Sequence, residues 1–298
     1  MKKIAVLFGG WCREREISII SKNSIAQALQ ELGYQIIEID LQKNLKELID
    51  TLNIEKPDAV FNCLHGPIGE GGTVQAILNY LQIPYTHSGM LASAIAMDKW
   101  KSYQFFSANN IPTPKTWLVN LTQNPDCPTT FPCVVKPVNE GSSFGVTLIK
   151  TKNEWQNILQ TWEYGDNAIV QEYLVCREIH VAILNNKPLG TIEINPSTEM
   201  FDYAAKYTPG NTEVVCPAIL SEADNTLALN TALKAYQALD CRNLARVDIM
   251  FDGTTFFVLE LNTQPGFTPV SLAPKIAKSQ RLSFNQLVND MVQSAQCD

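Results

Sequence analysis

Residues 246–266 read RVDIMFDGTTFFVLELNTQPG, and this stretch decides the fold. Two apolar runs, residues 247–251 and 256–261, flank a short polar segment that contains Gly253. Runs of this kind, separated by a few residues that include a glycine, are typical of two antiparallel strands joined in a hairpin. The sequence therefore predicts a β-hairpin over residues 247–261.

Three oxygen-bearing side chains lie on the predicted hairpin: Asp248 in its first strand, and Glu260 and Asn262 at the end of its second. Because residues two apart in a strand project from the same face, Glu260 and Asn262 share a face. Their oxygens suit a hard cation such as Mg²⁺, which usually takes a few carboxylates plus substrate phosphates. The alternative is a surface hairpin whose acids face water. The following turn, TQPGFT at residues 263–268, favours a site because its amides can approach a substrate closely.

Length and composition limit the class of protein. The chain has 298 residues, enough for a large core and about two domains. Hydrophobic residues make up 45% and charged residues 18%, which is typical of a compact globular protein. The net charge is −7 without a basic cluster, so a nucleic-acid surface is not expected. The eight cysteines form no C-x-x-C pair, which indicates reduced thiols rather than zinc ligands or disulfides.

The first apolar run is too short for a signal peptide. It ends at Gly9-Gly10, and the charged residues 13–16 follow it. No apolar stretch reaches the length of a membrane span. We therefore expect a cytoplasmic protein that interacts with neither membranes nor nucleic acids.

Strands and helices alternate in the N-terminal part of the chain. Apolar periodicity predicts strands at residues 4–8, 34–40 and 59–64, and helices at residues 16–32, near 45–52 and from about 73 to 81. This alternation predicts a parallel sheet whose loops at the carboxyl ends of the strands form a binding edge. Neither G-x-G-x-x-G nor G-x-x-x-x-G-K-[ST] is present, which argues against a dinucleotide or P-loop site.

Glu14 and His65 lie in two of the loops at this predicted edge. Glu14 alone is compatible with an exposed first turn of a helix, where the helix dipole favours acids. His65 alone is compatible with a helix cap or a buried structural histidine. Their position at one edge of one sheet makes both candidate site residues.

A Gly/Ser-rich loop follows in the middle of the chain. Strands are expected at residues 132–136 and 144–149, and the loop between them contains Glu140-Gly-Ser-Ser143. Such a loop can fold over phosphates and donate its amides, with the Lys136 ammonium at the strand end. A flexible hairpin tip is the alternative. Lys99 lies in a helix expected from about residue 98.

Further antiparallel strands are expected at residues 168–174, 178–184 and 189–194. Residues 196–213, which include Lys206 and Tyr207, are expected to form a long functional loop. Ser221 is expected to cap a helix that extends to about residue 239. Two closing helices are expected at residues 270–277 and 283–292.

These segments together resemble the D-alanine–D-alanine ligases of the ATP-grasp superfamily over nearly the whole chain. The matching motifs, in chain order, are LFGG…EREIS, LHG…GEGGTVQ, YT…SG…AS…MDK, VKP…EGSS…G, DY…AKY and RVD…ELNT…PG. The resemblance implies an α/β (α+β) ATP-grasp fold. It would comprise an N-terminal parallel-sheet domain over residues 1–95, a central subdomain over residues 96–174 and a C-terminal catalytic subdomain over residues 175–298.

The family joins two D-alanines to D-alanyl-D-alanine for peptidoglycan synthesis, at the expense of ATP and through an acyl phosphate. The resemblance implies two Mg²⁺ ions, with Mn²⁺ as a possible substitute, on Asp248, Glu260 and Asn262. It also implies a homodimer. The residues implied for ATP are Lys99, Lys136, Glu140, Ser143, Gln171, Glu172, Tyr173, Leu174 and Glu178.

The resemblance also implies roles toward the amino acids. Glu14, supported by His65, would bind the first ammonium, and Arg246 with the Gly266 amide would stabilise the oxyanion. The second carboxylate would meet Ser271 and Leu272 at a helix start. Glu14, Ser142 and Tyr207 would hydrogen-bond together, and Lys206 would meet the γ-phosphate.

Four departures from the family pattern occur, at Trp11-Cys12-Arg13, Gly71, Gln171 and Leu244-Ala245. None removes an expected metal ligand, phosphate lysine or the oxyanion arginine. Two alternatives stay open: a ligase with another second substrate, such as D-lactate or D-serine, and a nucleotide-binding protein without turnover.

Overall fold

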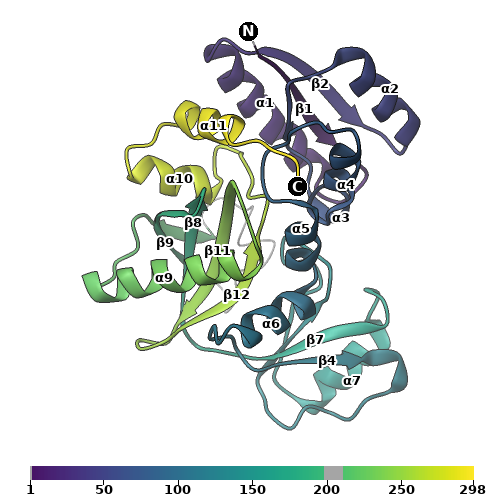
Figure 1. The fold of residues 1–298 in the computed structure, drawn as a ribbon. Helices are drawn as coiled ribbons and strands as arrows, with labels where there is room; N and C mark the ends of the chain where they lie inside the picture. Colours follow the sequence, from purple (N-terminus) through teal and green to yellow (C-terminus); the bar gives the residue numbers. More distant parts are fainter. Residues whose placement is uncertain (1, 198–210) are drawn as a thin grey trace.

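The computed structural model describes residues 2–197 and 211–298, which form three sheets with flanking helices (Figure 1). One sheet is parallel and the other two are antiparallel. This mixed α/β architecture confirms the expected fold class. The three sheets lie within residues 1–95, 96–174 and 175–298, respectively.

The first sheet has the strand order β2-β1-β3, and all its pairs are parallel, as the alternation predicted. Its strands are β1 Lys3–Gly9, β2 Gln35–Leu41 and β3 Ala59–Asn62, with helices α1 Arg15–Glu31 and α2 Leu45–Glu55. The helix expected from residue 73 is α4 Thr73–Tyr80, preceded by the short α3 Gly66–Glu70. Gly72 has φ +89, so it separates α3 from α4. Helix α5, Met90–Met97, was not expected.

The central sheet is antiparallel, in the order β4-β7-β5-β6. Its elements are α6 Lys99–Ala108, β4 Thr116–Asn120, the 3-10 turn η1 Leu121–Gln123, β5 Cys133–Pro137, β6 Thr147–Ile149, α7 Lys152–Thr161 and β7 Asn167–Glu172. Strand β4 was not expected. The expected pairing of β7 with the strands after it was wrong, because β7 lies between β4 and β5. Its inward side chains, such as Ala168 and Val170, join the small core that surrounds Trp155.

The third sheet is also antiparallel, in the order β10-β9-β8-β11-β12. Its strands are β8 Arg177–Leu184, β9 Lys187–Pro196, β10 Thr212–Val215, β11 Leu244–Phe251 and β12 Phe256–Asn262. The hairpin of β11 and β12 confirms the expectation for residues 247–261. The remaining helices are α9 Glu222–Ala238, α10 Leu272–Ser279 and α11 Phe284–Gln293, and Ser221 caps α9 as expected.

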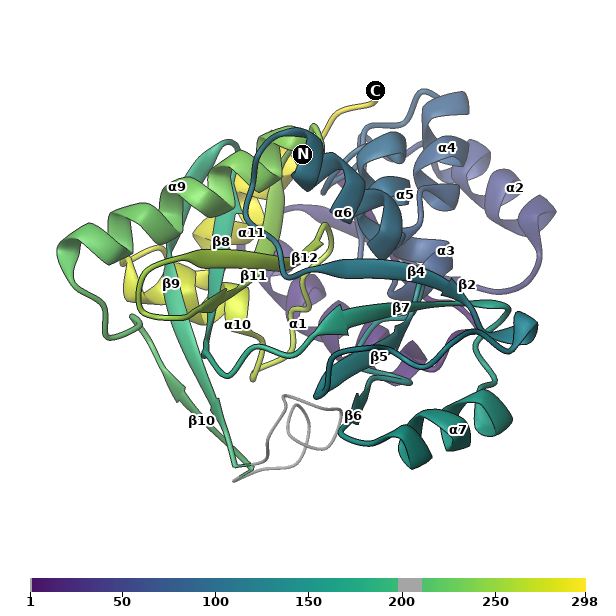
Figure 2. The ribbon, with the colours of Figure 1, turned by 90° about the horizontal axis from the view of Figure 1, so that it is seen from below.

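The first and third sheets share buried contacts, whereas the central sheet has its own core. Helix α11 packs against α1, and one apolar cluster joins both elements to β8 and β9. Figure 2 shows the central and third sheets side by side, with α7 along the central sheet and α9 along the third. The space between these two sheets therefore lies between separately packed units.

No helix within residues 2–197 and 211–298 is long and apolar enough to cross a membrane.

A buried amide joins the first sheet to the segment that follows β12. The Gln264 Nε2 donates to the Leu64 carbonyl, and the Asn62 Nδ2 donates to the Gln264 Oε1 at 2.7 Å. Gln264 is 2% exposed. We expect Gln264→Leu to lower the free energy of unfolding by about 1–3 kcal/mol, because two buried hydrogen bonds would be lost. Urea unfolding measures this change.

The exposed Gln42→Leu serves as the control and should change the free energy of unfolding by less than about 0.5 kcal/mol. Equal unfolding midpoints for the Gln264 and Gln42 variants would contradict the expected role of the bridge.

Candidate active site

Two adjoining cavities open between the three sheets. The first is about 160 Å³ and lies where the first and third sheets meet the loop after β5. The second is about 440 Å³ and lies between the central and third sheets. They share the side chains of Lys99, Glu140 and Glu260, so a ligand in one cavity can contact a ligand in the other.

The hairpin supplies the wall between the cavities. Arg246 is paired in register with Asn262, and Asp248 with Glu260, so the four side chains form two cross-strand pairs. Because they are two apart on each strand, all four lie on one face of the sheet. The register shifts directly after Asp248, and the β-bulge places Leu259 in the second cavity beside Glu260.

Asp248 is the most enclosed carboxylate of this wall, at 4% exposure. The Arg246 guanidinium makes a bidentate ion pair with it: Nε donates to Oδ1 at 2.6 Å, and Nη2 donates to Oδ2 at 2.8 Å. Burial alone would lower the pKa of Arg246, but the charge and hydrogen bonds of Asp248 outweigh it and raise that pKa. His180 lies between two carboxylates, with Nδ1 3.0 Å from Asp248 and Nε2 2.7 Å from Glu178.

Two lysines lie on the second cavity, at the side of the loop that follows β5. Lys99 donates to the Glu140 carbonyl at 2.7 Å and lies 3.3 Å from the Glu260 carboxylate. Lys136 is buried and donates to the Gln171 Oε1 at 2.9 Å. Burial lowers the pKa of Lys136 to about 8, helped by the charge of Lys99 and opposed by that of Glu260. A buried cation whose hydrogen-bond partner among the described residues is a neutral amide is well suited to receive an anion.

All nine residues expected to contact ATP line the second cavity: Lys99, Lys136, Glu140, Ser143, Gln171, Glu172, Tyr173, Leu174 and Glu178. Gln171 and Glu172 also have hydrogen-bond partners on the adjoining strand β4 and the residue before it. The Gln171 Nε2 donates to the Thr116 Oγ1 at 2.8 Å, and the Glu172 carboxylate accepts from the Lys115 amide at 2.9 Å. Apolar walls from β5, β9, β11 and β12 complete the cavity. This combination suits a flat apolar ring joined to phosphates.

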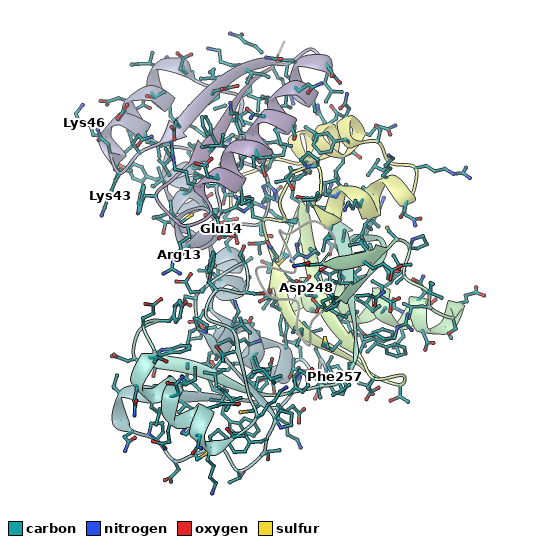
Figure 3. All side chains as sticks on the ribbon, turned by 180° about the vertical axis from the view of Figure 1, so that it is seen from behind. Arg13, Glu14, Lys43, Lys46, Asp248 and Phe257 are labelled. Atoms are coloured by element: carbon teal, nitrogen blue, oxygen red, sulfur yellow. The ribbon has the colours of Figure 1, made fainter. Side chains whose placement is uncertain are left out.

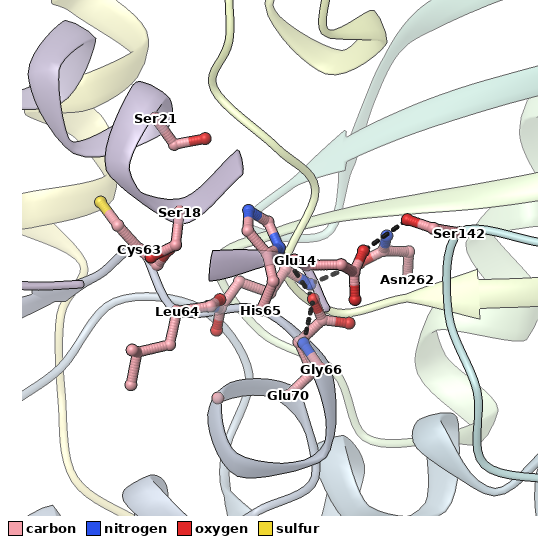
Figure 4. A network of polar contacts seen from close by, with 12 residues as sticks. Glu14, Ser18, Ser21, Cys63, Leu64, His65, Gly66, Glu70, Ser142 and Asn262 are labelled. Carbon is pink, nitrogen blue, oxygen red and sulfur yellow. Dashed lines mark hydrogen bonds and ion pairs between the residues drawn. The ribbon is translucent and has the colours of Figure 1, made fainter. Parts of the chain in front are cut away.

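Glu14 and Ser142 meet at the mouth of the first cavity, although 128 residues separate them. The Ser142 hydroxyl donates to the Glu14 carboxylate (Figure 4). Ser142 and Ser143 have φ +48 and +57, a left-handed conformation that costs free energy for non-glycine residues. Such backbone conformations persist where surrounding contacts hold them, and they cluster at functional sites.

His65 forms part of the wall of the first cavity and is 7% exposed. Its Nδ1 lies 2.9 Å from the Glu70 carboxylate, which also accepts from the Gly66 amide at 3.3 Å (Figure 4). Burial lowers the pKa of His65, but Glu70 and the charge of Glu14 outweigh it, so the net pKa is raised. The His65 Nε2 has no hydrogen-bond partner among the described residues, so this wall has a buried nitrogen available to a ligand.

The far wall of the first cavity carries Gly266, Ser271 and Leu272. Ser271 precedes α10, and its Oγ accepts from the Thr268 amide at 2.9 Å. A Cβ added at Gly266 would lie 3.1 Å from that Oγ, which is tight. The turn thus keeps its backbone close to the cavity, beside the amino end of a helix.

The structure brings every expected site residue that it describes onto one of these two cavities. Lys206 and Tyr207 lie outside the described residues, and their expected roles stay predictions. Glu70, Thr116 and His180 had no expected role in the site. Glu70 has a local signal, because it is an acidic residue five positions after His65. The Gln171 partner of Thr116 and the Asp248 partner of His180 lie on strands remote in sequence.

The donor set of the hairpin fits a hard cation held jointly by protein and ligand. Asp248 and Glu260 provide carboxylate oxygens, and Asn262 provides an amide oxygen. Within the part of the chain that the structure describes, no three His, Cys, Asp or Glu side chains converge as a metal-binding group. A cation at the hairpin would therefore need oxygens from a bound ligand as well, which is how Mg²⁺ usually binds.

A family model described as the C-terminus of D-ala D-ala ligases matches residues 100–293. The chain is 39% identical to a D-alanine–D-alanine ligase of Paramagnetospirillum magneticum, over 100% of this chain and 99% of the relative.

Solved structures give the same result. A D-alanine–D-alanine ligase from Bacillus anthracis superposes with a TM-score of 0.88 at 33% identity, over 99% of this chain and 97% of that chain. The same enzyme complexed with ATP gives a TM-score of 0.86 at 30% identity, with the same coverage. The VanG D-Ala:D-Ser ligase from Enterococcus faecalis gives 0.83 at 29% identity, over 98% of each chain.

We expect Gln171→Glu to raise the pKa of Lys136 by about one unit or more, because an opposite charge would replace a neutral acceptor in a buried site. The pH dependence of Lys136 acetylation, followed by mass spectrometry, reports this pKa, since only the neutral amine reacts. The profile of the variant should move to higher pH. Gln171→Met, of similar length but without the acceptor, should give no upward shift; the same profile for both variants would contradict the expectation.

Proposed function

The chain belongs to the D-alanine–D-alanine ligase family, whose members are ATP-dependent. On this basis we propose which substrate binds in each of the two cavities. The enzyme joins two D-alanines to D-alanyl-D-alanine. We assign ATP to the second cavity and both D-alanines to the first. The observation that carries this assignment is the shared wall, where Lys99, Glu140 and Glu260 border both spaces.

In this assignment the phosphates lie at the side of the second cavity that faces the first. Lys136 and Lys99 provide positive charge there, and the Gly/Ser-rich loop that includes Ser143 covers it. The pKa of Lys136, lowered by burial to about 8, returns toward its ordinary value when a phosphate binds beside it. The apolar wall near Leu174 takes the adenine ring, and Glu178 accepts from the ribose hydroxyls.

Glu14 and His65 bind the first D-alanine. The Glu14 carboxylate accepts from the substrate ammonium while the Ser142 hydroxyl holds it in place. The His65 Nδ1–H donates to Glu70, and the raised pKa of His65 favours the imidazolium, whose Nε2–H then donates to the substrate carboxylate. That carboxylate is thereby directed toward the phosphate end of the second cavity, where it is activated as an acyl phosphate.

Asp248, Glu260 and Asn262 are proposed to hold two Mg²⁺ ions, or Mn²⁺ as a substitute. Ions bound there would neutralise the transferring phosphoryl group and align it for attack. Lys99 and Arg246 are the present partners of Glu260 and Asp248. Both cations lie at the reacting end of the cavities, so each can turn from a carboxylate toward a substrate oxygen.

Arg246 and the Gly266 amide are proposed to stabilise the oxyanion formed when the second amine attacks. Ser271 and the amide of Leu272, at the start of α10, receive the carboxylate of the second D-alanine. Hydrogen-bond donors that are already in place stabilise charge as it develops in the transition state, because neither protein nor solvent has to reorganise. In a site that excludes water, this is often the largest single contribution to catalysis.

The second substrate has two alternatives to D-alanine. Similarity to a D-Ala:D-Ser ligase supports D-serine as an alternative second substrate, and D-lactate is the corresponding hydroxy acid. A nucleotide-binding protein without turnover is disfavoured by the presence of both lysines, Arg246 and all three oxygen ligands. We further propose a cytoplasmic homodimer that supplies peptidoglycan precursors.

One assay tests the proposal. Phosphate release from MgATP is measured with D-alanine alone, with L-alanine, and with D-alanine plus D-serine or D-lactate, while products are identified by mass spectrometry. We expect D-alanine alone to support phosphate release together with D-alanyl-D-alanine. Absence of phosphate release that depends on D-alanine would overturn the proposal, and a mixed product would identify another second substrate.

We expect Asn262→Ala to lower kcat at least about 100-fold at ordinary Mg²⁺, with partial recovery at raised Mg²⁺, because one oxygen ligand is lost. Asn262→Asp is the matched control. Asp at this position keeps an oxygen ligand. It also keeps an acceptor for the Gln264 backbone amide, which donates to the Asn262 Oδ1 at 2.8 Å. Asn262→Asp should therefore retain far more activity than Asn262→Ala. Normal kcat for Asn262→Ala would remove Asn262 from the metal site.

Arg246→Ala should lower kcat by about 10²–10³-fold and change the affinity for ATP less, because charge that develops in the transition state would lose its donor. Arg246→Lys should restore little activity, since an ammonium cannot make the fork that Arg246 makes with Asp248. Steady-state kinetics with direct measurement of ADP binding separates the two effects. A fully active Lys variant would show that positive charge alone suffices.

A further inference from the structure

Arg13 extends from the loop between β1 and α1 to the loops that adjoin the central sheet. Its Nη2 lies 3.8 Å from the Glu163 carboxylate. Its Cζ lies 5.3 Å from the Phe144 ring centroid and 5.9 Å from that of Tyr164. Figure 3 shows Arg13 and Glu14 at the gap between the N-terminal and central units. Arg13 is one of the residues that depart from the family pattern.

The surface that Arg13 contacts belongs to the loop that covers the phosphate end. Phe144 follows Ser142 and Ser143, and its amide donates to the Gly141 carbonyl at 3.0 Å. Tyr164 supports the same loop, because a Cβ added at Gly145 would lie 2.6 Å from its ring. Arg13 therefore packs on both the loop and the ring beneath it.

The attraction comes mainly from the aromatic rings. The side chains of Arg13 and Glu163 are 59% and 65% exposed, and ion pairs as exposed as this stabilise little. A guanidinium within about 6 Å of a ring centroid gains from the quadrupole of the ring and can stack on its face, which an ammonium does less well.

We propose that Arg13 is a positioning residue that holds the loop of residues 140–145 against the N-terminal domain. The contact acts beside Glu14, and it keeps Ser142 within reach of the Glu14 carboxylate before any ligand binds. This proposal rests on the proposed function, in which Glu14 binds the first D-alanine and the loop covers the phosphates.

Loss of this contact has a consequence for chemistry. A loop that opens more often admits water to the activated carboxylate, whose hydrolysis releases phosphate and returns free D-alanine. The ratio of phosphate released to dipeptide formed then rises above one. A defect in general stability lowers both products together and leaves the ratio unchanged.

The contact is tested without ligands by amide hydrogen exchange in the full chain. The amides of Phe144 and Val146, which donate hydrogen bonds to carbonyls of the loop, report its opening. We expect exchange about two- to fivefold faster in Arg13→Ala, intermediate in Arg13→Lys and almost unchanged in Glu163→Gln. Lys43→Ala is the matched control, because it removes a cation from the outer surface of the same domain (Figure 3).

Equal exchange in Arg13→Ala and Lys43→Ala would overturn the proposal, and so would a Glu163→Gln effect as large as that of Arg13→Ala. In the ligase assay, Arg13→Ala should raise the ratio of phosphate to dipeptide, and Arg13→Lys should partly restore it. An unchanged ratio would also overturn the proposal. A parent enzyme without D-alanine-dependent phosphate release would refute the proposed function instead, whatever the exchange rates.

Discussion

The register between β11 and β12 is the constraint on which both cavities depend. It pairs Arg246 with Asn262 and Asp248 with Glu260, so four polar side chains share one face. A slip of β12 by one residue would send Glu260 and Asn262 to the apolar face that packs against α9. The apolar residues between them, such as Val247 and Leu261, are buried and hold the register. The core on one side of the hairpin thereby fixes the chemistry on the other.

Charge is balanced within the site before any ligand arrives. Arg246 and His180 flank Asp248, and Lys99 lies beside Glu260. A buried carboxylate without such partners would be costly, because its desolvation would be uncompensated. Ligand binding on the proposed assignment is therefore an exchange of partners, in which cations that now neutralise carboxylates turn to phosphate and substrate oxygens.

The sequence predicted those parts of the fold and site that have a local signal. The first sheet and the hairpin have clear periodicity, and many of the expected site residues lie in the hairpin, at strand ends or in glycine-rich loops. Helix α5 was missed because MLASAIAM is apolar on nearly every side and shows no helical period. Strand β4 was missed because it is an edge strand with exposed Trp117 and Leu118. The bridge from Thr116 to Gln171 depends on strand pairing, which no local pattern reveals.

The distribution of cores determines where the site can open. The first and third sheets share a continuous apolar cluster through α1, α10 and α11, so separating them would expose core residues to water. The central sheet has its own cluster around Trp155 and meets the N-terminal loop through surface contacts, among them those of Ser142 with Glu14 and of Arg13 with Phe144. Opening between these units would expose less apolar core than separating the first and third sheets, so it should cost less free energy. Admission of a nucleotide and coverage of its phosphates then depend on the same small set of contacts.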